Sequence, residues 1–128
     1  MKNQGYGQRK QGLEESKLSK IPALNQNKDF RRLYARGKSK VHPALVCYVM
    51  KNRVGFCRIG ITASKKIGNA VQRNRARRVI REACRLLLPG IKPEYDIVFV
   101  ARGRTVSCKS TYIYRIMQEQ LMALRVMK

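Results

Sequence analysis

Acidic side chains are scarce in this chain of 128 residues. Only seven Asp and Glu residues stand against 29 Lys and Arg residues, which gives a formal net charge of +22 at neutral pH. The carboxylates show no spacing typical of metal ligands, and the single histidine, His42, has no serine or cysteine partner implied by the sequence. The sequence therefore predicts neither catalytic residues nor a metal site on the protein itself.

Long apolar runs and paired cysteines are also missing. The longest apolar run, Ala44 to Met50, is far shorter than the roughly 20 residues needed to span a bilayer. Residues 1–20 are basic and contain no hydrophobic segment, so we expect no secretory signal. The four cysteines lack C-x-x-C spacing, and Cys47, Cys57 and Cys84 fall within apolar patterns. Buried, reduced thiols in a cytoplasmic protein without a membrane partner are the expectation.

Positive charge is what the chain has in excess. So much self-repulsion is tolerable when the working partner is itself a polyanion, and nucleic acid is favoured over a membrane. The length fits one folded domain, which we place at residues 23–128 as a single RNA-binding α+β domain. Residues 1–22 are predicted to be a flexible basic tail, because their apolar residues are too sparse for a core. Whether such a tail adds affinity or is simply an unstructured end stays open.

Much of the charge gathers in one predicted helix. Residues 65–85 hold eight basic residues and a single acidic one, Glu82. Asn69 followed three residues later by Gln72 is typical of a capping box, which would begin the helix there. Leu88-Pro89-Gly90 is expected to end it, because proline cannot continue the backbone hydrogen bonds.

This predicted helix has one apolar and one basic face. The apolar stripe consists of Ala76, Val79, Ile80, Ala83 and Leu87. The other face carries Arg73, Arg77, Arg81 and Arg85 at intervals of four, with Asn74, Arg75 and Arg78 beside them. Like charges at this spacing repel, so a merely solvated face would interleave Glu with the cations. We interpret the face as a rigid platform for phosphates, which guanidinium groups bind bidentately.

The basic helix and the loop before it resemble the signature of a known family. The run Ser64-Lys65-Lys66-Ile67-Gly68-Asn69-Ala70-Val71, continued by Arg73-Asn74-Arg75 and Arg77-Arg78, resembles the signature of the protein subunit of bacterial ribonuclease P. The likeness extends from about Leu24 to the C-terminus. It implies that an RNA subunit is the catalyst, uses Mg²⁺ held mainly by the RNA, and removes the 5′ leader of precursor tRNA. The protein would assist, which accounts for its missing catalytic groups.

The resemblance also implies which residues form the sites. Those expected to contact the catalytic RNA are Lys65, Lys66, Arg73, Asn74, Arg75, Arg77, Arg78 and Arg81. Those expected in a cleft for the single-stranded leader are Phe30, Tyr34 and Tyr48. The helical spacing alone places Phe30, Leu33 and Tyr34 on one face, and such a trio is more often simply core. The implied partners are the catalytic RNA and precursor tRNA, with no protein partner.

The remaining patterns predict an α+β fold. Helices are expected at Asn27–Gly37, over the basic segment and from a cap at Ser110, and strands at Ala44–Lys51, Val54–Ala63 and Tyr95–Ala101. A turn at Lys51–Arg53 would join the first two strands. These elements suggest a two-layer sandwich of helices on a small sheet. The resemblance sharpens the order to helix–three strands–helix–strand–helix around a four-stranded sheet. It adds a strand near Gly37–Val41 and a left-handed crossover through the basic helix, where general rules favour a right-handed one.

Two alternatives come from other function classes. A structural RNA-binding protein of the ribosome could share this composition and even this fold. A stand-alone protein nuclease fits poorly, because the sequence offers no catalytic constellation. RNA is favoured over DNA, because nothing indicates a dimer or a helix-turn-helix pair that would place the basic helix in a major groove. The Lys65 to Arg78 signature favours ribonuclease P over the ribosomal alternative.

Overall fold

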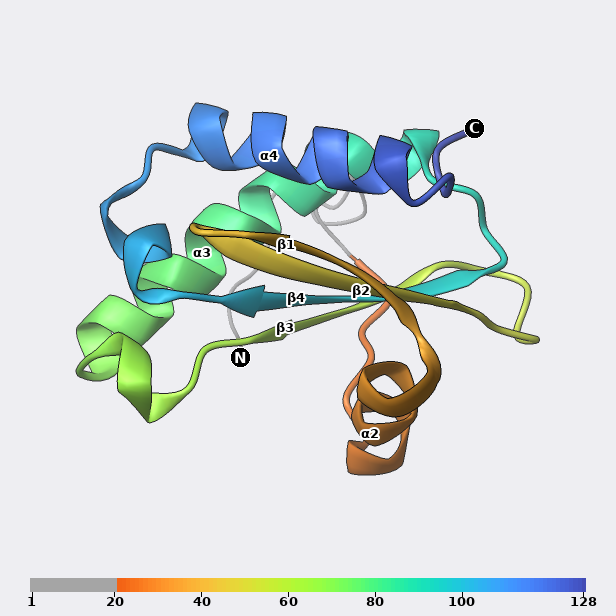
Figure 1. Ribbon diagram of the computed structural model, residues 1–128, viewed down its shortest axis with the longest axis horizontal. Helices are drawn as coiled ribbons and strands as arrows, with labels where there is room; N and C mark the ends of the chain where they lie inside the picture. Colours follow the sequence, from red (N-terminus) through yellow and green to blue (C-terminus); the bar gives the residue numbers. More distant parts are fainter. Residues whose placement is uncertain (1–20) are drawn as a thin grey trace, which may run out of the picture.

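The structure is a computed structural model that describes residues 21–128. Its elements, in chain order, are α2 (Asn27–Arg36), β1 (Lys38–His42), β2 (Leu45–Lys51), β3 (Arg58–Thr62), α3 (Ala70–Leu87), β4 (Tyr95–Ala101) and α4 (Ser110–Ala123) (Figure 1). Short 3₁₀ turns follow at Lys65–Ile67, Leu88–Gly90 and Gly103–Ser107. The predicted α+β class and the order helix, three strands, helix, strand, helix are confirmed. Of the predicted tail, residues 1–22, the first 20 lie outside the described residues.

The four strands form one mixed sheet in the order β1-β2-β4-β3. β2 pairs antiparallel with β1 and β4, whereas β3 pairs parallel with β4. The turn expected at Lys51–Arg53 is a longer loop, and β4 lies between the two strands that it joins. β3 accordingly begins at Arg58 rather than Val54. The crossover from β3 to β4 runs through α3 as expected, and its left hand stays a prediction from the resemblance.

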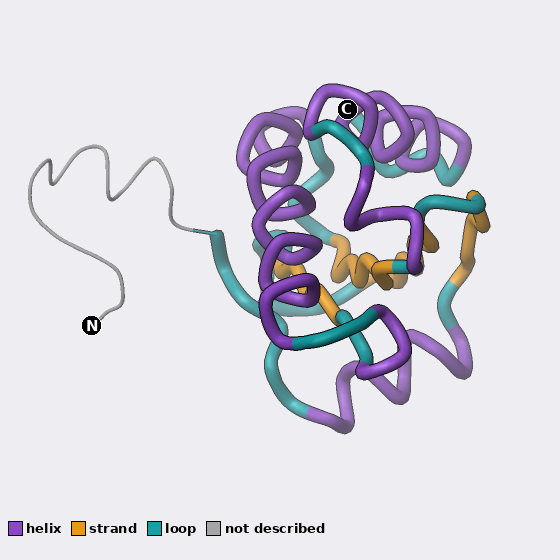
Figure 2. Tube along the Cα trace, turned by 90° about the vertical axis from the view of Figure 1, so that its left-hand side faces the viewer, coloured by secondary structure: helices purple, strands orange, loops and turns teal. Residues whose placement is uncertain are grey.

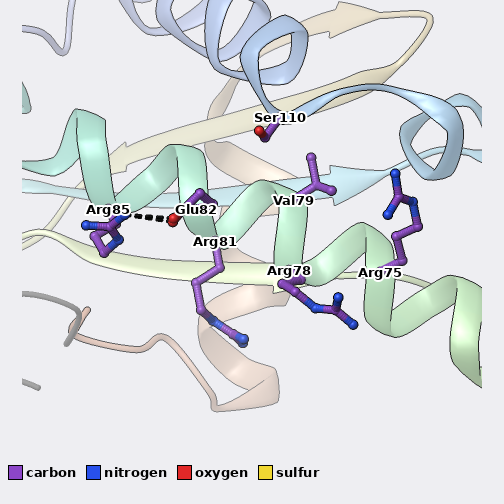
Figure 3. A pocket seen from close by; sticks show the side chains of 7 residues that line it. All are labelled: Arg75, Arg78, Val79, Arg81, Glu82, Arg85 and Ser110. Carbon is purple, nitrogen blue, oxygen red and sulfur yellow. Dashed lines mark hydrogen bonds and ion pairs between the residues drawn. The ribbon is translucent and has the colours of Figure 1, made fainter. Parts of the chain in front are cut away.

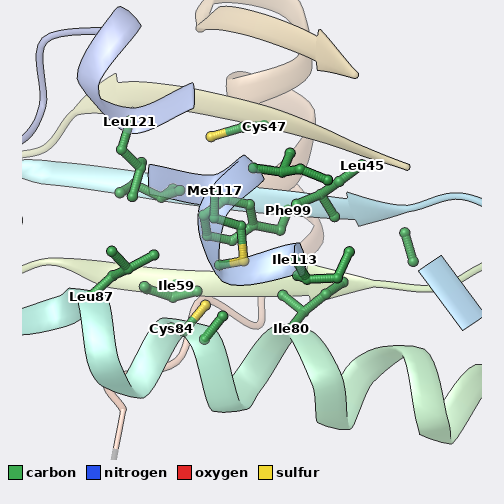
Figure 4. Close-up of a cluster of buried hydrophobic side chains, with 14 of the residues drawn as sticks. Leu45, Cys47, Ile59, Ile80, Cys84, Leu87, Phe99, Ile113, Met117 and Leu121 are labelled. Carbon is green, nitrogen blue, oxygen red and sulfur yellow. The ribbon is translucent and has the colours of Figure 1, made fainter. Parts of the chain in front are cut away.

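The main core lies between the sheet and the helices α3 and α4. Alternate residues of a strand point to one face, and on this face Leu45, Cys47 and Phe99 are fully buried. They meet Ile80 of α3 and Met117 of α4, which are also fully buried (Figure 4). This packing fixes the rotation of α3 about its own axis.

The second face of the sheet is covered in part by α2. Leu33 of this helix is fully buried with Leu24 and Val98, and Tyr48 of β2 packs beside them. Figure 2, turned by 90°, shows helical segments on both sides of the strands. The expected two-layer arrangement therefore gains a partial third layer, because β2 is apolar on both of its faces.

Two helix ends and one chain segment refine the predictions. Gly37 closes α2, but its N-cap is Gln26 without a side-chain cap. α4 begins at Ser110, yet the N-cap is Lys109 and no side chain caps the helix. Residues 21–24 lie along β3, where the Ile59 amide donates to the carbonyl of Pro22 at 2.9 Å. The end of the predicted tail, residues 21 and 22, is thus part of the folded unit.

The buried thiols are confirmed. Cys47, Cys57 and Cys84 are free and buried, and Cys108 is half-buried. Burial raises the pKa of the Cys57 thiol to about 12 and raises the pKa of Cys47 and Cys84 as well. These three thiols act as small apolar side chains in the core. No helix within residues 21–128 is long and apolar enough to cross a membrane.

Candidate nucleic-acid interface

The start of α3 is held by the predicted capping box. The backbone N–H of Gln72 donates to Asn69 Oδ1, and the backbone N–H of Asn69 donates to Gln72 Oε1, each at 2.9 Å. Gly68 precedes the box with φ 149°, and a Cβ at this position would lie 1.9 Å from Gln72 Oε1. The loop therefore needs glycine here. It holds Lys65 and Lys66, both exposed, against the N-terminus of α3.

The two faces of α3 are as predicted. The buried stripe contains Ala76, Ile80, Ala83 and Leu87, with Cys84 added and Val79 only half-buried. Because this stripe packs on the sheet, the arginines are turned away from the core. Asn74, Arg75, Arg78 and Arg81 are exposed, while Arg73, Arg77 and Arg85 are half-buried.

Three of these arginines also bond to the protein itself, which the sequence did not indicate. Arg73 Nη1 donates to the Gly68 carbonyl at 2.8 Å, and Arg75 Nε donates to the Val106 carbonyl at 2.8 Å. Arg77 donates to Asn74 Oδ1 at 3.2 Å and to the Ala63 carbonyl at 3.4 Å. Asn74 therefore orients Arg77. Within residues 21–128, Arg78 and Arg81 have no such bond, and their guanidinium groups are available to a ligand.

A hollow of about 430 Å³ runs beside this face (Figure 3). It is lined by Arg75, Arg78, Val79, Arg81, Glu82, Arg85 and Ser110. In Figure 3, Arg78 and Arg81 extend on the side of α3 away from Ser110, and Glu82 pairs with Arg85 at 2.7 Å. One carboxylate among four guanidinium groups leaves a strongly positive surface, which suits phosphate oxygens.

The three predicted aromatic residues come together on the α2 side of the sheet. The ring centroids of Phe30 and Tyr34 are 6.4 Å apart, and those of Tyr34 and Tyr48 are 5.0 Å apart at an edge-on angle of 70°. Tyr34 is 43% exposed, whereas Leu33 on the same helix is fully buried. The alternative that Phe30, Leu33 and Tyr34 are all core residues is therefore wrong for Tyr34. The rings form a partly open aromatic cluster.

A buried charge cluster was missed by the sequence analysis. Asp96, 1% exposed, accepts hydrogen bonds from Arg58 Nε at 2.9 Å, from Arg58 Nη2 at 2.7 Å and from Asn52 Nδ2 at 2.8 Å. Arg32 of α2 lies 3.5 Å from the same carboxylate. These bonds raise the pKa of Arg58, which stays charged. An aspartate inside an apolar strand was the available signal, because a buried charge must find partners.

The acidic residues form no metal site in the described part of the chain. No three His, Cys, Asp or Glu side chains in residues 21–128 gather as metal ligands would. Asp29, Glu82 and Asp96 are each paired with an arginine. His42 Nδ1 accepts the Ala44 amide at 3.0 Å. The arginines and aromatic rings described above can bind anions and stack on other rings.

Comparison with known proteins places the chain in a family. Residues 18–125 match the family model described as Ribonuclease P. The chain belongs to the family of ribonuclease P protein components. A relative from Clostridioides difficile (strain 630), named "Ribonuclease P protein component", is 48% identical over 86 residues, 66% of this chain and 75% of that protein. One from Thermoanaerobacter sp. (strain X514) with the same name is 41% identical over 103 residues, 80% and 89% of the two chains.

Solved structures agree with the family. The structure of the Staphylococcus aureus RNase P protein is 32% identical and covers 85% of this chain and 100% of that one, with a TM-score of 0.75. Membership in the family of ribonuclease P protein components implies a role in tRNA 5′ processing and an association with ribonuclease P RNA.

Proposed function

We propose that this chain is the RNA-binding protein subunit of ribonuclease P and assists maturation of tRNA 5′ ends. The catalytic RNA performs the magnesium-dependent hydrolysis of the phosphodiester, and the protein positions the RNAs. The observation that carries the proposal is the rotation of α3, whose buried stripe turns one arginine-rich face outward. The residues assigned to the catalytic RNA are Lys65, Lys66, Arg73, Asn74, Arg75, Arg77, Arg78 and Arg81.

The α3 face binds by charge and rigidity. Guanidinium groups on a capped helix present donors at fixed spacing to the phosphates of a folded RNA, whose narrow major groove excludes side chains. Each neutralised phosphate releases counterions, so binding weakens steeply as salt is added. The same positive charge offsets part of the repulsion between the two RNAs. The protein thereby lowers the magnesium concentration that the RNA needs.

The aromatic cluster of Phe30, Tyr34 and Tyr48 is assigned to the single-stranded 5′ leader of precursor tRNA. Unpaired bases stack on aromatic rings without demanding a particular sequence. Tyr34 has the exposed ring that stacking requires, and Phe30 and Tyr48 hold it in place. A site of this kind distinguishes precursor from mature tRNA, because only the precursor has a leader.

The protein supplies no catalytic group in this proposal. Three carboxylates are occupied by arginines, and Glu94 and Glu119 are exposed and far apart in the sequence. In this proposal the Mg²⁺ ions are held by the RNA, and the paired carboxylates of the protein are not assigned to them. We also place the protein in the cytoplasm, where its buried thiols stay reduced.

Co-purification separates this function from the ribosomal alternative. The tagged protein, isolated from cells of its own source at moderate salt, should carry one large RNA that is not ribosomal. That RNA should cleave a precursor tRNA at the 5′ end of the mature sequence. Recovery of ribosomal subunits in place of such an RNA would support the structural ribosomal role and reject the proposal.

A further inference from the structure

A second aromatic pair lies away from the α2 cluster, where the turn between β1 and β2 meets the start of α4. The ring centroids of His42 and Tyr112 are 6.3 Å apart at an edge-on angle of 73°. Tyr112 is 47% exposed and His42 is half-buried. Neither ring belongs to the two hydrophobic cores. Tyr112 therefore has a ring that is largely open to solvent.

The pair is held in place by the backbone around it. His42 Nδ1 accepts the Ala44 amide at 3.0 Å, which fixes the orientation of the imidazole ring. The buried Thr105 hydroxyl donates to the Ala44 carbonyl and so ties the turn to the segment before α4. Gln120 Nε2 donates to the carbonyls of Lys40 and Leu45, each at 3.0 Å, and joins α4 to the same hairpin. The two rings are therefore preorganised.

The surroundings of the pair are positive. Arg102, Arg104 and Lys109 are exposed, and residues 38–46 and 102–112 include no acidic residue. The surface continues to α3, because Arg75 Nε donates to the Val106 carbonyl at 2.8 Å. An exposed ring carried by segments that are rich in cations and lack carboxylates is a combination that suits an unpaired base and its phosphates.

We propose that His42 and Tyr112 form a stacking site for an unpaired nucleobase of the catalytic RNA subunit. The base stacks on the open face of Tyr112, His42 supports that ring from its edge, and Arg102, Arg104 and Lys109 contact the adjoining phosphates. The RNA subunit is the occupant because this surface joins the α3 face, whereas the cluster assigned to the leader lies on the α2 side of the sheet. The site rests on the proposed function and extends it to residues outside the family signature.

Affinity of the full chain for the cognate RNA subunit, measured without tRNA, tests the site. Tyr112→Leu keeps an apolar side chain but removes the aromatic face, and it should weaken binding about 5- to 150-fold. Tyr112→Phe keeps the face and should bind like the unaltered protein. Phe56→Ala removes an equally exposed ring, 49% exposed, from the loop before β3 and serves as the matched control. Arg104→Ala should lower the slope of affinity against salt by about one unit, while Tyr112→Leu leaves it unchanged.

The outcomes separate the site from the function on which it rests. Unchanged binding by Tyr112→Leu, beside weaker binding by Arg81→Ala, would overturn the stacking site and leave the proposed function standing. Unchanged binding by both variants would overturn both. If Tyr112→Leu weakens binding only when precursor tRNA is present, the stacked base belongs to the precursor. That result would overturn the assignment to the RNA subunit. An equal loss with Phe56→Ala would show that exposed rings in general matter, and would also reject the site.

Discussion

The arginines of α3 differ in what their guanidinium groups already contact. Arg78 and Arg81 are exposed without a described bond, while Arg73 and Arg77 also donate to backbone carbonyls. Arg81→Ala should therefore weaken binding to the RNA subunit and lower the salt slope by about one unit, with no change in the unfolding midpoint. Arg77→Ala should lose affinity and also about 0.5–1.5 kcal/mol of stability for its hydrogen bond.

The measurement is RNA affinity at several salt concentrations beside thermal unfolding. Lys128→Ala is the control, since it removes one exposed charge at the end of the chain. Equal weakening by Lys128→Ala would mean that total charge, rather than the α3 face, determines binding. A large drop in the unfolding midpoint of Arg81→Ala would make that arginine structural.

Two neighbouring residues of α2, Leu33 and Tyr34, are expected to have different roles. Tyr34→Ala should weaken binding of the holoenzyme to precursor tRNA more than to mature tRNA, because stacking is worth about 1–3 kcal/mol per base. Tyr34→Phe should preserve the preference. Leu33→Ala should chiefly lower the free energy of unfolding, by roughly 2–5 kcal/mol, because Leu33 is fully buried. If Tyr34→Ala weakens binding of both tRNA forms equally, or lowers the free energy of unfolding as much as Leu33→Ala, Tyr34 has a structural role and does not bind the leader.

At the scale of elements, the loop before α3 and the helix depend on each other. Gly68→Ala should displace the Gln72 side chain, break the capping box and impose a strained positive φ. We expect a loss of about 1–3 kcal/mol in the free energy of unfolding. RNA affinity should fall as well, because Lys65 and Lys66 move relative to α3.

Gln72→Ala separates the two contributions, since it removes the capping side chain and leaves the backbone of Gly68 unstrained. It should cost stability but less than Gly68→Ala. If Gly68→Ala unfolds at the same temperature as the unaltered protein, the close contact between Gly68 and Gln72 does not stabilise this loop.

Elements with strong local signals were predictable. The capping box, the buried stripe of α3 and the bounds of β2 and β4 follow from periodicity and end signals in nearby residues. The start of β3 was not predictable from nearby residues. The partner of β3 is β4 rather than β2, and that pairing depends on residues far apart in the chain. The partial third layer formed by α2 likewise depends on tertiary packing.

The site shows the same division. Which residues share the α3 face could be read from the spacing, and the resemblance supplied the aromatic trio. The contacts of these arginines with backbone carbonyls could not be predicted from the sequence. The loops that contain those carbonyls are placed by the fold, as for Arg73, Arg75 and Arg77. The partners of Asp96 were hidden for the same reason, although a charge within an apolar strand signalled that partners exist.

At the scale of the whole molecule, we expect the net charge of +22 to act on both the catalytic RNA and precursor tRNA. The chain should lower the magnesium concentration required for cleavage, because it offsets part of the phosphate repulsion on assembly and on docking of the substrate. The protein itself should contribute no cleavage, since its described carboxylates are mostly occupied by arginines.

Cleavage of precursor tRNA across a magnesium titration tests this account most directly, with the cognate RNA alone, the protein alone and the two together. The prediction is a shift of the half-maximal rate to lower magnesium when the protein is added, a smaller shift with the Arg78→Ala, Arg81→Ala double variant, and no cleavage by the protein alone. An identical magnesium dependence with and without protein, or specific leader removal by protein shown to be free of RNA, would contradict it.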